Sequence, residues 1–306
     1  MKIIKGLEQI HSIGDCAVTM GTFDGVHRGH HMLIERLIEE ARKRGLKSIL
    51  LTFDPHPRLF FGGAEKVKLL TTLDEKLDLL KMFDLDCVGV LEFNQALAAM
   101  SYQAFVDEIL LNKLRMRLLV VGYDHGFGKG REGTFENLKR LGRQLHFDVL
   151  KVEPLVTGEH IVKSSTIRRL LLEGDVKKAA ELLGHLYELK GKVVKGRLVG
   201  KKLEFPTANL YINDSAKLLP KDGVYAVDVK VIDRMYRGML NIGFRPTVNH
   251  STQRTVEVHI HDFSQDIYGK EITVFFKKRL RDERKFENLE ELKKQLLIDR
   301  EQSLKI

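Results

Sequence analysis

One ten-residue run combines two histidines with three glycines in a way that suits phosphate chemistry. The run is Gly21-Thr-Phe23-Asp24-Gly-Val-His27-Arg-Gly29-His30, and it follows the apolar segment Cys16–Met20. Glycine lets a backbone approach a phosphate closely, and a helix that begins here would offer free N–H groups and a positive dipole. Histidines three residues apart can both reach one anionic group. The pattern predicts a site for in-line attack on an α-phosphate, where positioning and charge stabilisation do most of the work.

A second stretch in the C-terminal half joins glycines to basic residues. It begins at Gly191, passes Gly196 and ends in Phe205-Pro-Thr207-Ala-Asn209. In an extended segment the side chains of Thr207 and Asn209 share one face. Their oxygens are hard ligands suited to Mg²⁺ bound with nucleotide phosphates. An ordinary turn followed by a strand explains the residues equally well.

Glu257 is a candidate general base. It shares one face of a predicted strand with His259 and His261, while Val256 and Val258 lie on the other face. A carboxylate at such a position can take a proton from an attacking hydroxyl. A polar face turned to solvent is the commoner explanation of this alternation.

Strand and helix signals alternate through the first 183 residues. Apolar segments predict strands at Cys16–Met20, Ser48–Phe53, Cys87–Leu91, Leu118–Val121 and Phe147–Val152. Between them, helical spacing predicts helices from about residue 33, after a Thr72–Glu75 capping box, after Ser101, and at Phe135–Leu145. Two short helices follow, Ile167–Leu172 and Val176–Leu183, and Gly184 ends the second. Apolar strands separated by single helices predict a doubly wound parallel sheet.

The pattern changes to period 2 after residue 184. Val224–Ile232, Arg254–His261 and Ile272–Phe276 are predicted strands with no helix between them, and Asn288 with Glu291 caps a final helix. Such strands predict an antiparallel barrel or closed sheet. We therefore expect an α/β protein of two domains, residues 1–184 and residues 185–306.

Composition limits the function further. The 306 residues are 43% apolar and 30% charged, which is typical of a soluble globular protein. No apolar run approaches the ~20 residues that span a membrane, and the N-terminus lacks a signal peptide's apolar stretch. The two cysteines, Cys16 and Cys87, lie in apolar runs, as expected of buried thiols in the cytoplasm. We therefore expect a cytoplasmic protein with no membrane partner.

The net charge of +9 does not require a nucleic-acid partner. Lys and Arg are spread along the chain, and aromatic residues are not interleaved with them as stacking platforms would be. A solvated surface with phosphate-binding sites explains the charge, so a nucleic-acid partner is not expected. The sequence does not indicate an oligomeric state.

The first motif, together with three further segments, resembles the FMN adenylyltransferase module of the nucleotidylyl-transferase superfamily. Those segments are Thr52-Phe-Asp-Pro-His-Pro57, Val121–Gly128 and Ser164-Ser165-Thr-Ile-Arg168. The C-terminal half is similar to riboflavin kinases, with Pro206–Asn209, Gly223–Ala226, Asn241–Thr247, Glu257–Phe263 and Leu280–Glu283 in their order. The resemblance, to bacterial bifunctional riboflavin kinases/FMN adenylyltransferases, covers roughly residues 15–300.

The resemblance implies two reactions. The C-terminal module would convert riboflavin and ATP to FMN and ADP, and the N-terminal module would convert FMN and ATP to FAD and pyrophosphate, both with Mg²⁺. The implied catalytic residues are His27, His30, Arg168 and Glu257. The implied nucleotide- and flavin-binding residues are Gly21, Phe23, Asp24, Gly29, Asp124, Phe127, Ser164, Ser165, Gly196, Thr207, Asn209, Arg281 and Glu283, and Thr207 and Asn209 would also hold the metal.

Three departures from the family pattern leave alternatives open. Lys163 replaces a usual serine, His125 stands where an aromatic residue is commoner, and Glu204 replaces a usual glycine. These positions permit a flavin- or RNA-binding regulator that has lost one activity. A nucleotidylyltransferase for another substrate, with the C-terminal half as an interaction module, is a further alternative.

Overall fold

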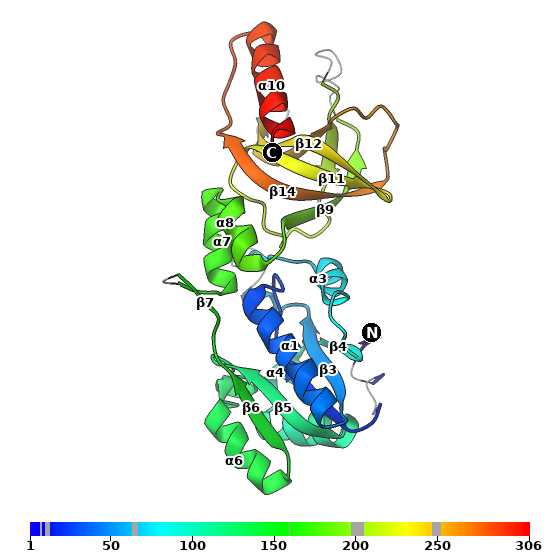
Figure 1. The fold of residues 1–306 in the computed structure, drawn as a ribbon, viewed down its shortest axis with the longest axis vertical. Coiled ribbons are helices and arrows are strands. Elements are labelled where there is room, and N and C mark those ends of the chain that lie inside the picture. Colours follow the sequence, from blue (N-terminus) through cyan, green and yellow to red (C-terminus); the bar gives the residue numbers. More distant parts are fainter. Residues whose placement is uncertain (7, 10–12, 63–66, 159, 197–204, 247–251) are drawn as a thin grey trace. The chain divides into compact units, whose positions relative to one another are not determined.

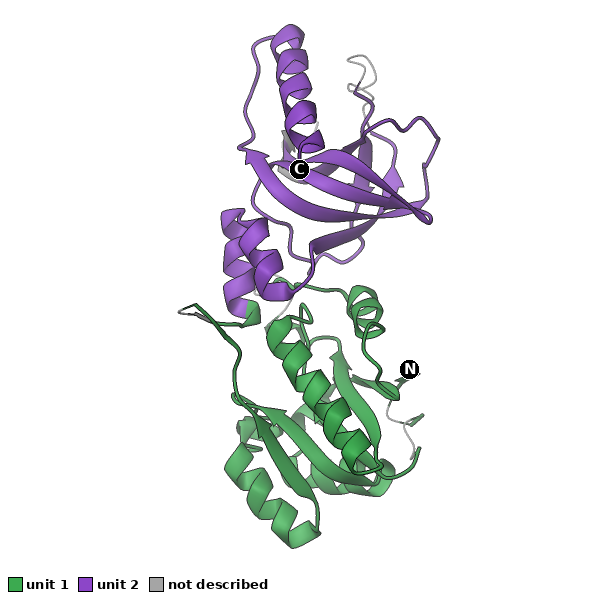
Figure 2. Ribbon diagram, in the orientation of Figure 1, with its two compact units in different colours: residues 1–164 green, residues 165–306 purple. Residues whose placement is uncertain are grey.

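The chain forms two compact units. The computed structural model describes residues 1–306 except 7, 10–12, 63–66, 159, 197–204 and 247–251. The first unit is residues 1–164 and the second is residues 165–306 (Figure 2). The helices α7 (Ser164–Glu173) and α8 (Val176–Leu183), which we placed in the first domain, fall almost wholly in the second unit.

A six-stranded parallel sheet is the centre of the first unit (Figure 1). Its strand order is β1-β4-β3-β2-β5-β6. The strands are β1 (Lys2–Lys5), β2 (Cys16–Met20), β3 (Lys47–Asp54), β4 (Cys87–Glu92), β5 (Met116–Gly122) and β6 (Asp148–Val152). All five predicted strands are confirmed. The sequence did not indicate β1, because two of its four residues are lysines and only Ile4 is buried.

Helices cover both faces of this sheet, as a doubly wound fold requires. Along β2, Ala17 packs with residues of α1 (Arg28–Lys43) and α3 (Leu73–Leu80) on one face. Cys16, Val18 and Met20 pack on the other face with residues of η1 (Phe105–Lys113) and α6 (Phe135–Leu145). The shorter elements are α2 (Pro57–Gly62), α4 (Gln95–Ala99), α5 (Tyr102–Ala104), η2 (Lys129–Arg131), β7 (Val156–Thr157) and β8 (His160–Ile161).

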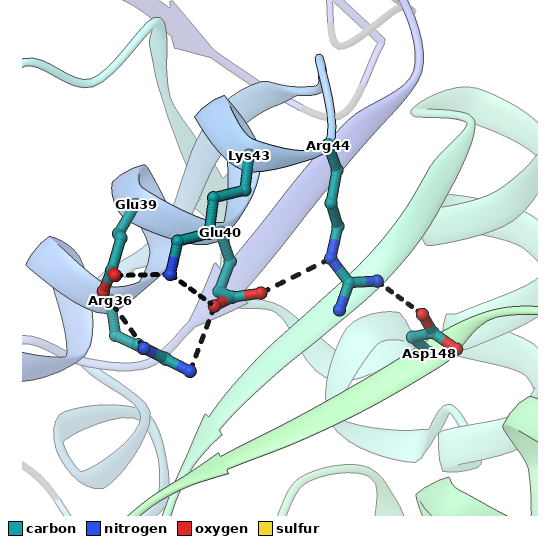
Figure 3. Close-up of polar contacts among 6 residues, drawn as sticks. All are labelled: Arg36, Glu39, Glu40, Lys43, Arg44 and Asp148. Carbon is teal, nitrogen blue, oxygen red and sulfur yellow. Dashed lines mark hydrogen bonds and ion pairs between the residues drawn. The ribbon is translucent and has the colours of Figure 1, made fainter.

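Figure 3 shows an ion-pair network that ties the end of α1 to the edge strand β6. Glu40 is only 7% exposed, and its carboxylate forms ion pairs with Arg36 at 3.0 Å and with Arg44 at 3.4 Å. Arg44 also contacts Asp148 of β6 at 2.5 Å. Isolated surface pairs stabilise little, but a shared network around a buried carboxylate restricts the helix more firmly.

The second unit is a closed six-stranded antiparallel barrel. Its order is β10-β13-β12-β11-β14-β9, and the pairing of β9 with β10 closes it. The strands are β9 (Tyr187–Val194), β10 (Ala208–Tyr211), β11 (Gly223–Val231), β12 (Arg234–Pro246), β13 (Thr252–Ile260) and β14 (Glu271–Arg281). The three predicted strands are confirmed as β11, β13 and β14. The sequence pattern did not name β12, where Gly238 and Gly243 interrupt the alternation.

The terminal helix α10 (Leu289–Leu304) covers part of the outer face of the barrel. Leu292 and Leu296 pack against Phe205 and Met239, and Ser303 lies 2.7 Å from Nε2 of His261. His259 and His261 are therefore buried, at 8% and 3% exposed. A solvent-facing surface, the commoner explanation of their alternation, is wrong for these two residues because the helix takes the place of water.

The burial of His261 predicts an acid-sensitive second unit. Burial, assisted by nearby His259, lowers the pKa of His261 to about 4. The unfolded chain therefore binds a proton that the folded unit excludes as the pH falls from about 6.5 to about 4, so stability is lost over this window. Thermal unfolding of His261→Gln should show a smaller loss between these pH values than the wild type. Parallel pH profiles for the two proteins would contradict the prediction.

Candidate functional sites

The turn after β2 holds an unusual backbone conformation. Phe23, Gly25 and Val26 all have positive φ angles, of 47°, 83° and 36°. Positive φ is strained for Phe and Val, but both side chains are buried in the core, at 1% and 0% exposed. The core packing of these two side chains holds the strained turn in place. The turn lies at the carboxyl end of β2, which pairs with β3 on one side and β5 on the other. Ligands of open α/β sheets bind at this position.

Asp24 ties the turn to neighbouring segments. Its Oδ1 accepts hydrogen bonds from the backbone N–H groups of Leu70 and Thr71, at 2.9 and 3.1 Å. Oγ1 of Thr71 accepts from the N–H of Gly25 at 3.0 Å. Ser164 donates its hydroxyl to the carbonyl oxygen of Asp24 at 3.0 Å. The structure thus gives Asp24 and Ser164 a part in shaping the turn, and their contact with a nucleotide stays a prediction.

His27 and His30 are brought together at the start of α1. Their rings stack with centroids 3.6 Å apart, and Nδ1 of His27 accepts the N–H of His30 at 3.3 Å. Because Nδ1 accepts, neutral His27 carries its proton on Nε2. A Cβ at Gly29 would lie 3.2 Å from the His27 ring, which is closer than an ordinary contact, so glycine leaves room for this ring. Burial is the main cause that lowers the pKa of His30 well below its usual value, and the neighbouring His27 and His31 lower it further. The two imidazole rings therefore lie together at the start of α1.

The sequence did not identify Lys76 as part of this region. Lys76 lies on α3, is 4% exposed, and donates to Oγ1 of Thr52 at 2.9 Å. Thr52 in turn donates to the carbonyl oxygen of Thr22 at 3.3 Å. Burial lowers the pKa of Lys76 to about 8, against the opposing effect of Asp24 and Asp54. Nothing in the spacing of Thr72–Leu80 distinguishes this lysine from an exposed one, so only its burial reveals it.

The remaining residues predicted for the first site belong to several separate segments of the chain. Phe127 packs edge-on against Phe105 at 5.3 Å, at the margin of the core. Asp124 is exposed in the turn after β5. Lys163 lies over the Tyr123 ring at 5.3 Å. Gly21 begins the turn, and Ser165 and Arg168 belong to the second unit on α7, so their roles at this site stay predictions.

The predicted residues of the second unit gather on the outer face of the barrel. Asn209 of β10 and Asn241 of β12 are both cross-strand partners of Glu257 on β13. Cross-strand partners on one face bring their side chains together. Oγ1 of Thr207 lies 3.5 Å from Oε2 of Glu257. Helix α10 covers the continuation of this face at His259 and leaves Glu257 half-buried beyond it.

Two glycines make room for this cluster. A Cβ at Gly196 would lie 2.1 Å from the amide nitrogen of Asn209, and a Cβ at Gly243 would lie 1.9 Å from Oε1 of Glu283. The side chain of Asn241, which the sequence placed in a family segment without a role at the site, donates to Oε1 of Glu283 at 3.2 Å. Glu204 lies outside the described residues.

The side chain of Arg281 forms an ion pair with Asp299. Its Nε lies 3.0 Å from both carboxylate oxygens of Asp299 on α10, and its Nη2 lies 2.7 Å from Oδ2. The sequence predicted Arg281 beside the flavin, and that contact stays a prediction. The structure adds that the guanidinium is held from the terminal helix.

Other features of the described residues do not mark a site. No group of three or more His, Cys, Asp or Glu among them is placed to hold a metal ion. Across the same residues, no helix is both long and apolar enough to cross a membrane. Two cavities of about 520 and 570 Å³ near α1, α6 and β6 include none of the predicted site residues.

Comparisons with known proteins agree with the two-unit division of chemistry. Residues 9–166 match the FAD synthetase family model, and residues 183–306 match the riboflavin kinase model. The bifunctional riboflavin kinase/FMN adenylyltransferase of Escherichia coli K12 is 37% identical over 98% of this chain and 96% of its own length. The Listeria monocytogenes protein of the same name is 36% identical over 92% and 89%. A crystal structure described as a macrolide-efflux protein from Streptococcus pneumoniae matches with a TM-score of 0.90 at 31% identity, covering 98% of both chains.

The buried ammonium of Lys76 should make the stability of the first unit depend on pH in the alkaline range. Between pH 8 and about 10.5 the unfolded chain holds a proton that folded Lys76 has lost, so the lysine's destabilising effect fades as the pH rises. The stability of Lys76→Met relative to wild type should therefore fall by up to about 1.4 kcal/mol per pH unit across this window. Calorimetric unfolding at several pH values measures it. Lys81→Met, which changes an exposed lysine, is the control, and an equal slope in both variants would refute the assignment.

Proposed function

Because the chain belongs to the family of bifunctional riboflavin kinases/FMN adenylyltransferases, we propose that its two clusters of side chains each carry one of the two reactions. The protein phosphorylates riboflavin with ATP to FMN, and it adenylylates FMN with ATP to FAD and pyrophosphate. The observation that carries the division is the placement of the clusters. The stacked His27 and His30 lie in the part matched by FAD synthetases, and the Glu257 cluster lies in the part matched by riboflavin kinases.

In the adenylyl transfer, a phosphate oxygen of FMN attacks the α-phosphorus of ATP and pyrophosphate leaves. Charge builds on the α-phosphate oxygens as the new bond forms, so donors placed there stabilise the transition state. The N–H on Nε2 of His27 and the N-terminus of α1 supply such donors. His30 is neutral in the free protein because burial lowers its pKa, and an anionic phosphate beside it favours the protonated, donating form.

Further contacts of the first site are inferred from the motifs. Arg168, one turn into α7, would clamp phosphate oxygens with its planar guanidinium. Ser165 and Gly21 would line the nucleotide, and Phe127 and Asp124 the flavin side. Lys76 supports the turn through two hydrogen bonds. Lys76 donates to Oγ1 of Thr52 at 2.9 Å, and Thr52 donates to the carbonyl oxygen of Thr22 at 3.3 Å.

In the kinase reaction, the ribityl 5′-hydroxyl of riboflavin attacks the γ-phosphorus of ATP and ADP leaves. The carboxylate of Glu257 takes the hydroxyl proton as the O–P bond forms, and general-base help of this kind is typically worth ~10²–10⁴-fold. Asn209 and Asn241 are its cross-strand partners, one on each neighbouring strand. Glu283, held by Asn241, would border the flavin together with Arg281.

Both reactions use nucleotide phosphates that bind Mg²⁺, and the residues at the kinase site fit this metal. Thr207 Oγ1, 3.5 Å from Glu257 Oε2, and the side-chain oxygen of Asn209 are hard donors. They are too few to form a complete metal cage, which suits Mg²⁺ that is held mainly by ATP phosphates and water. When bound, the ion would neutralise phosphate charge.

The buried thiols of Cys16 and Cys87 support a location in the reducing cytoplasm. The partners that the two reactions require are small molecules: riboflavin, FMN and ATP.

Two substitutions should separate the activities. Glu257→Gln removes the base and should lower FMN formation from riboflavin by ~10²–10⁴-fold, while FAD formation from supplied FMN persists. His30→Ala should lower FAD formation and spare FMN formation. Chromatography of flavins after incubation with ATP and Mg²⁺ measures both. Glu271→Gln, at an exposed barrel glutamate, is the control. Loss of both activities in either folded variant would overturn the two-site assignment.

Gly243→Ala tests the placement of Glu283. The added methyl group would occupy the space of the Glu283 carboxylate, 1.9 Å from Oε1. Because Glu283 is exposed and can swing away, stability should change by only about 0.5 kcal/mol. Riboflavin phosphorylation should nevertheless weaken by about tenfold, as measured by the riboflavin KM, since the carboxylate loses its bond to Asn241. Unchanged kinetics would show that the position of Glu283 does not matter for the reaction.

A further inference from the structure

The terminal helix is fastened to the segment that leaves β14 by a buried carboxylate. Asp299 is 0% exposed, the lowest value of any acidic residue that the structure describes. Its oxygens accept three contacts from Arg281 at 2.7–3.0 Å. Gln295, one turn earlier on α10, donates to Oδ1 at 2.8 Å. A carboxylate buried this deeply is costly unless its partners hold it in a defined geometry, so the position of Arg281 is closely restricted.

A second contact fixes the same segment three residues later. Nη2 of Arg284 donates to Oε1 of Gln295 at 2.5 Å. Residues 281 and 284 are therefore both held against α10, and Glu283 lies between them. Its carboxylate reaches Asn241 at 3.2 Å and lies over Gly243. Asn241 is the cross-strand partner of Glu257.

These contacts form one chain from the helix to the site. Asp299 holds Arg281, the backbone from Arg281 to Arg284 carries Glu283, and Glu283 meets Asn241 beside Glu257. A change at Asp299 would move Glu283 without touching ATP or the base.

We propose that Asp299 is a positioning residue for riboflavin phosphorylation, which it serves by holding the Arg281–Glu283 segment where the flavin binds. The proposal rests on the proposed function of the Glu257 cluster. It makes the terminal helix part of the kinase site, although the helix packs on the outside of the barrel. The role is specific to riboflavin: ATP binding at Thr207 and Asn209 and adenylylation in the first unit do not depend on this contact.

The test is steady-state kinetics of the full-length protein carrying Asp299→Asn, which keeps the side chain's size and removes its charge. The riboflavin KM should rise by about tenfold, while the ATP KM of the kinase reaction and FAD formation from supplied FMN stay within about twofold. Asp299→Glu, which keeps the charge, should recover part of the loss. The control is Asp262→Asn, which weakens the exposed ion pair between Asp262 and Arg300 of α10, 3.2 Å apart. This variant should leave all the kinetic constants unchanged.

A second variant keeps the proposal testable if Asp299→Asn does not fold. Gln295→Met removes the contacts of Gln295 with Arg284 and with Oδ1 of Asp299 but keeps the direct Arg281–Asp299 pair, and Gln295 is only half-buried. It should raise the riboflavin KM two- to threefold, in the same direction. An unchanged riboflavin KM in a folded variant, or an equal loss of both activities, would overturn the proposal. If the wild type itself formed no FMN, the proposed function would fail instead.

Discussion

The first unit depends on one strained turn. The backbone between β2 and α1 takes positive φ at Phe23, Gly25 and Val26, and the two apolar side chains are buried in the core. The same turn directs Asp24 toward Leu70 and Thr71 and places His27 where its ring caps α1. Without that burial, the strain would relax and the stacked histidines would lose their geometry. The hydrophobic core therefore contributes to the chemistry through the backbone that it holds.

The second unit reaches its geometry by a different route. Its reactive side chains stand on adjacent strands of a closed barrel, so hydrogen-bonded register sets their spacing. Glu257 lies between Asn209 and Asn241 because β13 pairs with both β10 and β12. Helix α10 then divides the outer face into a dry part at His259 and His261 and a more accessible part at Glu257. The same helix that buries the histidines holds Arg281 through Asp299.

Each unit also contains a buried ionisable group that links its stability to pH. Lys76 and His261 each have a pKa lowered by burial, to about 8 and about 4. Each makes a short hydrogen bond to a hydroxyl group, from Lys76 to Thr52 and between His261 and Ser303. Such groups cost stability when they are charged, and their hydrogen bonds limit that cost. Their titration links the stability of each unit to pH without requiring any direct contact with substrate.

The sequence by itself determined the features that depend on neighbouring residues. Alternation, helical spacing and caps predicted five strands of the sheet, the Thr72–Glu75 capping box and the Asn288 cap of α10, because these signals are local. The motifs also named His27, His30, Thr207 and Glu257. Only the tertiary structure decided which distant residues meet. Lys76 lies beneath Thr52, Asn241 lies beside Glu257, and Arg281 turns to Asp299. These contacts depend on strand order, register and the docking of a helix, which no short window of sequence specifies.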